Sequence, residues 1–282
     1  MKKFVSAALA LCLAGALTAC AGGASSSEST VDESSSAVSS ESTSSEASSD
    51  ETSAADSTAE TGDAAVLSYD EYMAADLDTE VTIEAYVQAK QAYYAEQQTA
   101  TVYLQDQDGA YFAYDMACSE EDYDKLTPGT LIRVTGYKSE WSGEVEIMDG
   151  SFTFVEGGDT FIAEPADMTE LLGTDELAAH QNEFVSFTGL TVAPSTIEGD
   201  DAEYAFLYNY DGSGSDGDDL YFNVSYNDQT YTFVVESYLC DNTTDVYNAV
   251  KNLEVGQTID CQGFLYWYEG ANPHITSVTV AG

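Results

Sequence analysis

Apolar and polar residues alternate along several short stretches between residues 79 and 155. Val81, Ile83 and Ala85 alternate with polar neighbours, and this period of two predicts a half-buried strand over 81–87. Further strands are predicted over 101–105, 110–115, 131–138 and 144–148, with 152–155 continuing the last. Asp108 and Gly109 predict a hairpin turn, because an Asp-Gly pair accepts positive φ. This stretch is therefore predicted to be a β domain.

Two short helices are predicted around these strands. Ser68 and Glu71 have the spacing of a capping box, which predicts a leading helix after Ser68. Ser119 is the predicted N-cap of a helix over 119–126, and acidic residues fill its first turn, where the helix dipole favours anions. Three strands, a helix and two more strands are typical of the OB-fold, a closed five-stranded barrel.

The same order is predicted again in the C-terminal part of the chain. Strands are predicted over 184–192, 220–225, 229–236, 257–264 and 274–280, with a helix over 244–253. A long insertion over 193–219 contains an extra edge strand at 204–210. LTPGTLIRVTGYKSEWSG at 126–143 and LEVGQTIDCQGFLYWYEG at 253–270 also align without a gap. The predicted fold class is mainly β: two tandem five-stranded OB-fold barrels, each with a short helix between strands 3 and 4, after a disordered N-terminal tether.

The segment from 79 to 155 resembles the OB-fold domains of secreted lipoproteins from anaerobic Gram-positive bacteria, which are related in pattern to the tRNA-anticodon-binding type. The resemblance is carried by VTIEAYVQA, VYLQDQDGAYFAY, KLTPGTLIRVTGY and WSGEVEI. The tail GFLYWYEGANPHITSVTV resembles the closing segment of the same lipoproteins. The resemblance implies the barrel fold and carries no catalytic motif.

The first twenty residues have the pattern of an export signal. Lys2 and Lys3 precede an apolar run over 4–16, and residues 17–20 resemble the bacterial lipobox, in which the cysteine receives lipid. Cys20 therefore predicts a lipid anchor on the extracytoplasmic face of the cell membrane; an ordinary signal peptide is the alternative. The predicted organisation is a signal peptide at 1–20, a disordered Ser-rich acidic linker at 21–63, the first barrel with its leading helix at 64–156, a connector at 157–182 and the second barrel at 183–282.

The chain is strongly acidic, with 51 Asp and Glu against 7 Lys and Arg and a formal net charge of −44. Affinity for nucleic acid depends largely on Lys and Arg that neutralise phosphates, so this charge argues against nucleic acid as a partner. It suits a cationic partner, a divalent cation, or a solvated acidic surface, which is the simplest interpretation.

Cysteines and acidic loops give two candidate structural sites. Cys240 and Cys261 could form a disulfide, because an extracytoplasmic location permits one, and buried free thiols are the slightly preferred alternative. Asn209, Asp211 and Asp216 are candidate calcium ligands in a loop that begins like an EF-hand loop. The EF-hand register then fails, so a flexible acidic loop is the preferred interpretation and no cofactor is predicted.

Aromatic hairpins are the candidate ligand-binding site. In a strand, consecutive side chains point to opposite faces, so at least one large ring of the run 266–268 is predicted to be exposed. Exposed rings would form a stacking platform, since OB barrels bind oligosaccharides and oligonucleotides. The alternative is that these rings seal a barrel end or the contact between barrels. The candidate residues are Trp141, Tyr266, Trp267, Tyr268, Asn272 and His274.

No catalytic motif is present, and the chain is not predicted to be an enzyme. Glu144 and Glu146 form a carboxylate pair, but a glycosidase needs a deep cleft, which a single small barrel rarely offers. The predicted function is a membrane-anchored, non-catalytic lipoprotein whose barrels bind a glycan or an envelope protein. The alternatives are a structural or assembly module of the cell envelope, or the single-stranded nucleic-acid binding that is typical of the fold.

Overall fold

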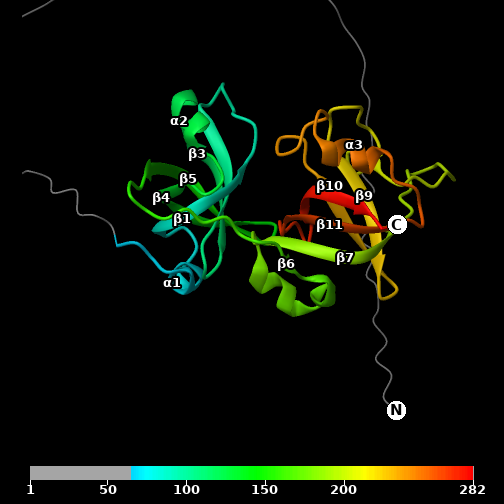
Figure 1. Ribbon diagram of the computed structural model, residues 1–282, viewed down its shortest axis with the longest axis horizontal. Helices are drawn as coiled ribbons and strands as arrows, with labels where there is room; N and C mark the ends of the chain where they lie inside the picture. The colour runs from blue at the N-terminus through cyan, green and yellow to red at the C-terminus, as the bar shows by residue number, and fades with distance from the viewer. Residues whose placement is uncertain (1–64, 282) are drawn as a thin grey trace, which may run out of the picture. The chain divides into compact units, whose positions relative to one another are not determined.

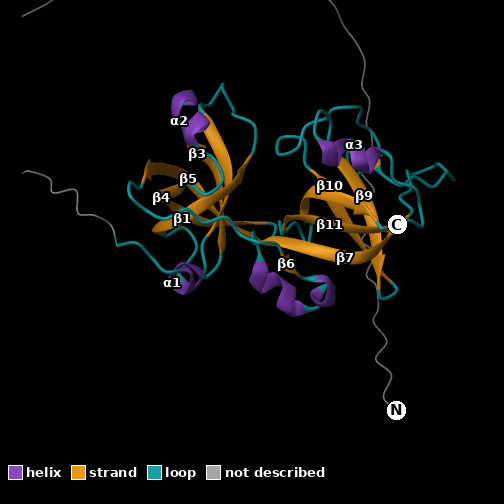
Figure 2. Cartoon of the chain, in the orientation of Figure 1, coloured by secondary structure: helices purple, strands orange, loops and turns teal. Residues whose placement is uncertain are grey.

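The computed structural model describes residues 65–281, and both β domains belong to one compact unit (Figure 1). Cys20 and the predicted linker at 21–63 lie outside the described residues. Strands dominate the described part, and its helices are short (Figure 2). None of the helices within 65–281 is long and apolar enough to cross a bilayer.

The first β domain is a closed barrel with the strand order β1-β2-β3-β5-β4. Helix α1 precedes the barrel with the predicted capping box between Ser68 and Glu71, and α2 begins after Ser119 between β3 and β4. The elements are α1 Tyr69–Ala74, β1 Glu80–Lys90, β2 Thr99–Gln105, β3 Ala110–Ala117, α2 Glu120–Lys125, β4 Leu131–Trp141 and β5 Glu144–Phe154.

The second β domain repeats this plan. Strands β7, β11, β12, β10 and β9 follow one another around the barrel, and a pairing between β7 and β9 closes it. Two short strands, β6 and β8, extend the sheet, and β6 belongs to the predicted connector. The elements are β6 Ala166–Asp167, η1 Thr169–Leu171, η2 Asp175–His180, β7 Phe184–Ala193, β8 Leu207–Tyr208, β9 Leu220–Tyr226, β10 Gln229–Val235, α3 Asp245–Lys251, β11 Thr258–Phe264 and β12 His274–Val280. The predicted fold class is confirmed.

The glycines shared by the two aligned stretches have a steric reason. A Cβ atom added to Gly136 would lie 2.8 Å from the backbone oxygen of Met148, and one added to Gly263 would lie 2.2 Å from that of His274. Both glycines stand at an irregularity in the register, between β4 and β5 or between β11 and β12. Only glycine allows the two strands to approach so closely at these points.

Cys240 and Cys261 are buried free thiols, the alternative that the sequence analysis slightly preferred to a disulfide. They belong to the apolar core of the second barrel, where each packs among hydrophobic side chains. Burial raises the pKa of Cys240 to about 11 and raises the pKa of Cys261 as well. Both side chains therefore act as small hydrophobic residues.

Candidate ligand-binding groove

A small aromatic cluster joins the outer faces of the two barrels. Val102 and Leu104 point into the first core, so Tyr103 between them on β2 points outward. The rings of Tyr103 and Phe264 stack with their centroids 4.3 Å apart and an angle of 14° between their planes. Tyr103, Phe264 and Phe112 from β3 are all buried, and they form an apolar core separate from those of the barrels. We call this set the interbarrel cluster.

His274 adds a polar contact to the interbarrel cluster. Its Nδ1 atom lies 2.8 Å from the hydroxyl of Tyr103, and its ring stacks on Tyr266 with the centroids 4.3 Å apart. Burial lowers the pKa of His274 to about 3, so the imidazole is neutral. This predicted ligand-binding residue therefore positions Tyr266 and joins the barrels through Tyr103.

Hydrogen bonds surround the interbarrel cluster. The amide of Phe184 donates to Oε1 of Gln105 over 2.9 Å, and Nε2 of Gln91 donates to Oε2 of Glu236 over 3.1 Å. The amide of Ala92 also donates to the carbonyl of Tyr238 over 2.6 Å. Polar groups on the two barrels thus satisfy one another across the contact.

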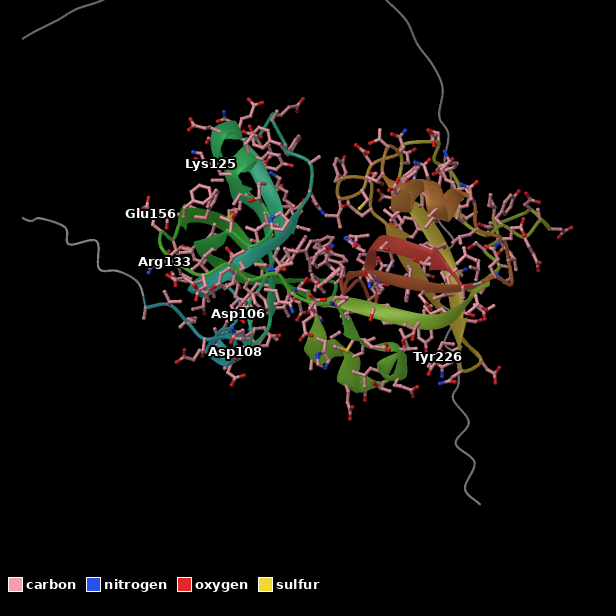
Figure 3. All side chains as sticks on the ribbon, in the orientation of Figure 1. Asp106, Asp108, Lys125, Arg133, Glu156 and Tyr226 are labelled. Atoms are coloured by element: carbon pink, nitrogen blue, oxygen red, sulfur yellow. The ribbon has the colours of Figure 1, made fainter. Side chains whose placement is uncertain are left out.

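A groove of about 1390 Å³ lies beside the interbarrel cluster, with residues of both barrels in its wall. No lysine or arginine of the described chain lines it. Lys125 and Arg133, both labelled in Figure 3, instead pair with acidic side chains of the first barrel at 3.1 and 2.7 Å. The aromatic and acidic lining residues are Tyr93, Tyr94, Phe112, Tyr114, Asp115, Trp141, Glu146, Tyr210, Tyr221, Tyr231, Glu236, Tyr238, Tyr266, Tyr268 and Glu269.

The groove brings together five of the six predicted ligand-binding residues. Trp141 and Tyr268 line it with 60% and 52% of their surfaces exposed, and Tyr266, Asn272 and His274 line it as well. The sequence analysis assumed that these rings continue a strand. The structure corrects this, because β11 ends at Phe264 and the run 266–268 lies in a loop before β12.

Trp267 is the predicted residue that does not line the groove. Its indole packs against the core of the second barrel and covers Gly143, where an added Cβ atom would lie 2.8 Å from the ring. The ring therefore has the packing role that the sequence analysis weighed as the alternative.

Sequence reasoning missed most of the tyrosines that line the groove. Tyr114 follows Phe112 on the outward face of β3, so alternation along that strand was an available signal. Tyr93, Tyr210 and Tyr238 come from loops, for which no periodicity exists. Their convergence depends on how the two barrels pack, which the sequence pattern does not encode.

Two buried carboxyl groups, Glu144 and Glu146, and a half-buried one, Glu236, stand in or beside the groove. Desolvation raises the pKa of Glu144 to about 8, although its Oε2 atom accepts a 2.8 Å hydrogen bond from the amide of Trp267. Desolvation followed by repulsion from Asp115 raises the pKa of Glu146 to about 7. Desolvation followed by repulsion from Asp219 raises that of Glu236 to about 7. A single barrel lacks a deep cleft, but the two barrels together form a groove, and Glu146 and Glu236 line it.

The predicted calcium ligands have other partners. Oδ1 of Asp211 accepts a 3.0 Å hydrogen bond from the amide of Ser213, while Asp216 binds Lys251 and Asn242. The described residues contain no group of three or more His, Cys, Asp or Glu side chains placed to hold a metal ion. The two carboxylates fasten the loop through these contacts, and the assignment of Asn209, Asp211 and Asp216 as calcium ligands stays a prediction.

Comparisons with known proteins give distant structural matches alone. No family model and no curated protein matches this chain. Among solved structures, the Ifi202 HINa domain in complex with 20-base-pair double-stranded DNA has a TM-score of 0.32 and 12% identity over 73% of this chain and 96% of its own. A murine DNA-binding protein bound to double-stranded DNA gives 0.33 and 12% over 71% and 96%. A Replication Protein A heterotrimer bound to single-stranded DNA gives 0.30 and 12% over 72% and 49%.

These comparisons correct one prediction. The sequence analysis argued from charge against nucleic acid as a partner, whereas the similar structures are described with double-stranded or single-stranded DNA bound. Net charge is a property of the whole chain, including 21–63, and does not decide what one local surface binds. That exclusion is therefore withdrawn.

Replacing Glu144 tests whether a proton is held beside the groove. Oε1 of Glu144 and Oδ1 of Asn182 are buried without a hydrogen-bond partner, and a proton on Glu144 would remove the cost of burying its charge. Because the folded-state pKa of Glu144 lies above 4.5, its stabilising contribution is complete below about pH 4.5 and is lost as the pH rises through about 8.

The free energy of unfolding of the unaltered chain should fall between about pH 4.5 and pH 9 as Glu144 ionises. In Glu144→Gln this fall should be smaller by roughly 4 kcal/mol. Urea unfolding at both pH values measures it, with Glu176→Gln as the control for one exposed charge. A variant as pH-sensitive as the unaltered chain would contradict the assignment. The free energy of unfolding of the variant should still fall somewhat as the pH rises, because folding also raises the pKa values of Glu146 and Glu236.

Proposed function

We propose that this chain is a non-catalytic binding protein that holds a glycan in the groove between its two OB-fold barrels. The main support is the lining of the groove, which combines eleven Tyr, Trp and Phe side chains with four carboxylic acids and no Lys or Arg of the described chain. Sugar rings present apolar faces to aromatic rings and hydroxyl groups to carboxylates. Pockets that bind small ligands have this same mixture of apolar walls and a few polar groups.

The exposure of two rings supports binding over a purely structural role. Trp141 and Tyr268 lie on different barrels, at the ends of the two aligned stretches, and more than half of each side chain is exposed. Rings that served only to join the barrels would be buried, as Tyr103 and Phe264 are. Exposed apolar surface that is concentrated in a groove is typical of an interaction site.

A glycan and peptidoglycan array tests this function. We expect Trp141→Ala and Tyr268→Ala each to weaken binding of the best glycan about tenfold, because loss of one stacked ring removes roughly 1–2 kcal/mol. Tyr137→Ala is the matched control, since Tyr137 is 45% exposed but does not line the groove. Mass spectrometry of the recovered glycan checks for cleavage.

Single-stranded DNA oligomers form the competing arm of the array experiment, because OB barrels also stack nucleotide bases on aromatic rings. Glycan binding that depends on Trp141 and Tyr268 would support the proposal. DNA binding that depends on the same two rings would replace it with a nucleic-acid function. Equal loss in Tyr137→Ala would contradict the assignment of the groove, and a cleaved glycan would contradict a non-catalytic role.

We further propose that Cys20 is acylated and anchors the barrels on the extracytoplasmic face of the membrane. The support is the lipobox pattern at 17–20 after a charged and apolar leader. Several acyl chains hold a protein stably, since each buried methylene contributes about 0.8 kcal/mol.

Expression with an alkyne-bearing fatty acid tests the anchor. We expect the label on the unaltered chain in the membrane fraction and its complete absence from Cys20→Ala. Cys118→Ala, which removes a buried cysteine, is the control and should keep the label. Label that persists in Cys20→Ala would refute this attachment site.

A further inference from the structure

Glu146 occupies an exceptional position in the wall of the groove. On β5, Ile147 belongs to the first core and Val145 packs against it, so Glu146 between them points outward into the groove. The second barrel covers this face, and only 5% of the residue surface stays exposed. The sequence thus places a carboxylic acid where solvent hardly reaches it.

The carboxyl of Glu146 has no hydrogen-bond donor or cation within the described chain. The neighbouring buried acids differ in this respect: Glu144 accepts from the amide of Trp267, and Glu236 accepts from Gln91 and from the amide of Tyr238. Burying an unpaired carboxylate is costly, and this cost raises the pKa of Glu146 to about 7. Folding alone therefore leaves one strong acceptor unused at the wall of the groove.

Aromatic rings surround this acceptor. Phe112 pairs with Glu146 in the register between β3 and β5. The ring centroid of Phe112 lies 5.5 Å from that of Tyr266 and 6.3 Å from that of Tyr114. The charge of Glu146 raises the pKa of both tyrosines, although desolvation contributes more. Ring faces carry partial negative charge, so they attract the same cations as a carboxylate does.

We propose that Glu146, Tyr114 and Tyr266 form a subsite for an organic ammonium group. Glu146 supplies the negative charge, and the two rings contact the alkyl groups that surround the nitrogen. A metal ion fits less well, since the described residues contain no group of three or more His, Cys, Asp or Glu side chains of the kind that calcium or zinc requires. The inference rests on the proposed function in one respect, that the groove is where the ligand binds, and it specifies a cationic group on that ligand.

Choline and 3,3-dimethyl-1-butanol are the matched probes, because they share one shape and differ by a positively charged nitrogen in place of a carbon. Titrations followed by saturation-transfer NMR at about pH 8 keep Glu146 ionised. We expect choline to bind at least tenfold more tightly than the neutral alcohol. Glu146→Gln should lower the choline affinity about tenfold, and Glu176→Gln, which removes an exposed charge outside the groove, should not.

The variants should keep their fold. Glu146→Gln removes an uncompensated buried charge without changing the shape of the side chain, so its melting temperature should equal or exceed that of the unaltered chain. Tyr114→Leu is a second variant at a half-exposed position, and it should also weaken choline binding.

Three results would overturn the subsite: no binding of choline, equal affinity for choline and the neutral alcohol, or unchanged choline affinity in Glu146→Gln and Tyr114→Leu. Choline contains no sugar ring, so its binding is measured independently of the glycan array. If no glycan binds but choline does, the proposed glycan function is wrong and the ammonium subsite is still supported. If choline fails and glycans bind through Trp141 and Tyr268, the glycan function stands without it.

Discussion

The stacking of Tyr103 on Phe264 is the contact on which the groove depends. Each OB barrel completes its own core, so nothing inside one barrel requires the other. The outward-facing rings of β2, β3 and β11 change this, because they form a third apolar core where the barrels meet. The hydrogen bond between Tyr103 and His274 then fixes one relative placement, since a buried hydroxyl without a partner would cost roughly 1–3 kcal/mol.

This contact also explains the unusual electrostatics of the site. Glu144, Glu146 and Glu236 would be ordinary surface acids on separate barrels, and packing the barrels together desolvates them. Two of the three acids receive backbone or side-chain donors from the facing barrel. The third, Glu146, receives none, so the packing that stabilises the aromatic cluster leaves this carboxyl group without a donor from the described chain, and its pKa rises to about 7.

The sequence predicts the strands well and the groove in part. Alternation at Val81, Ile83 and Ala85 and the shared glycines identify both barrels, because these patterns arise within one barrel. The same reasoning predicts at least one exposed ring in the run 266–268 and includes Trp141 and Tyr268 among the candidate binding residues, and both are exposed. It gives Tyr103 no special status, since nothing in the pattern shows that its outward face meets a second barrel. Sequence reasoning also did not predict a cleft beside Glu146, because it considered one small barrel, whereas the groove is lined by both.

The loop between β11 and β12 shows the second limit of pattern reasoning. The exposure argument applied strand alternation to the aromatic run at 266–268, but these residues lie in the loop after β11, where Trp267 packs against the core and Tyr268 is exposed. Aromatic residues have high strand propensity, and tertiary packing overrides it at this point. At Asp211 and Asp216, the carboxylates accept hydrogen bonds from neighbouring residues of the described chain, a role that the sequence pattern does not show.

Scanning calorimetry of the unaltered chain and of Tyr103→Ala tests most directly whether the interbarrel cluster unites the two barrels. The account predicts one cooperative transition for the unaltered chain. It predicts two separate transitions after Tyr103→Ala, because removal of a buried ring costs about 3–5 kcal/mol at the only apolar core that the barrels share within residues 65–281. Two independent transitions in the unaltered chain, or a single unchanged transition in Tyr103→Ala, would contradict it.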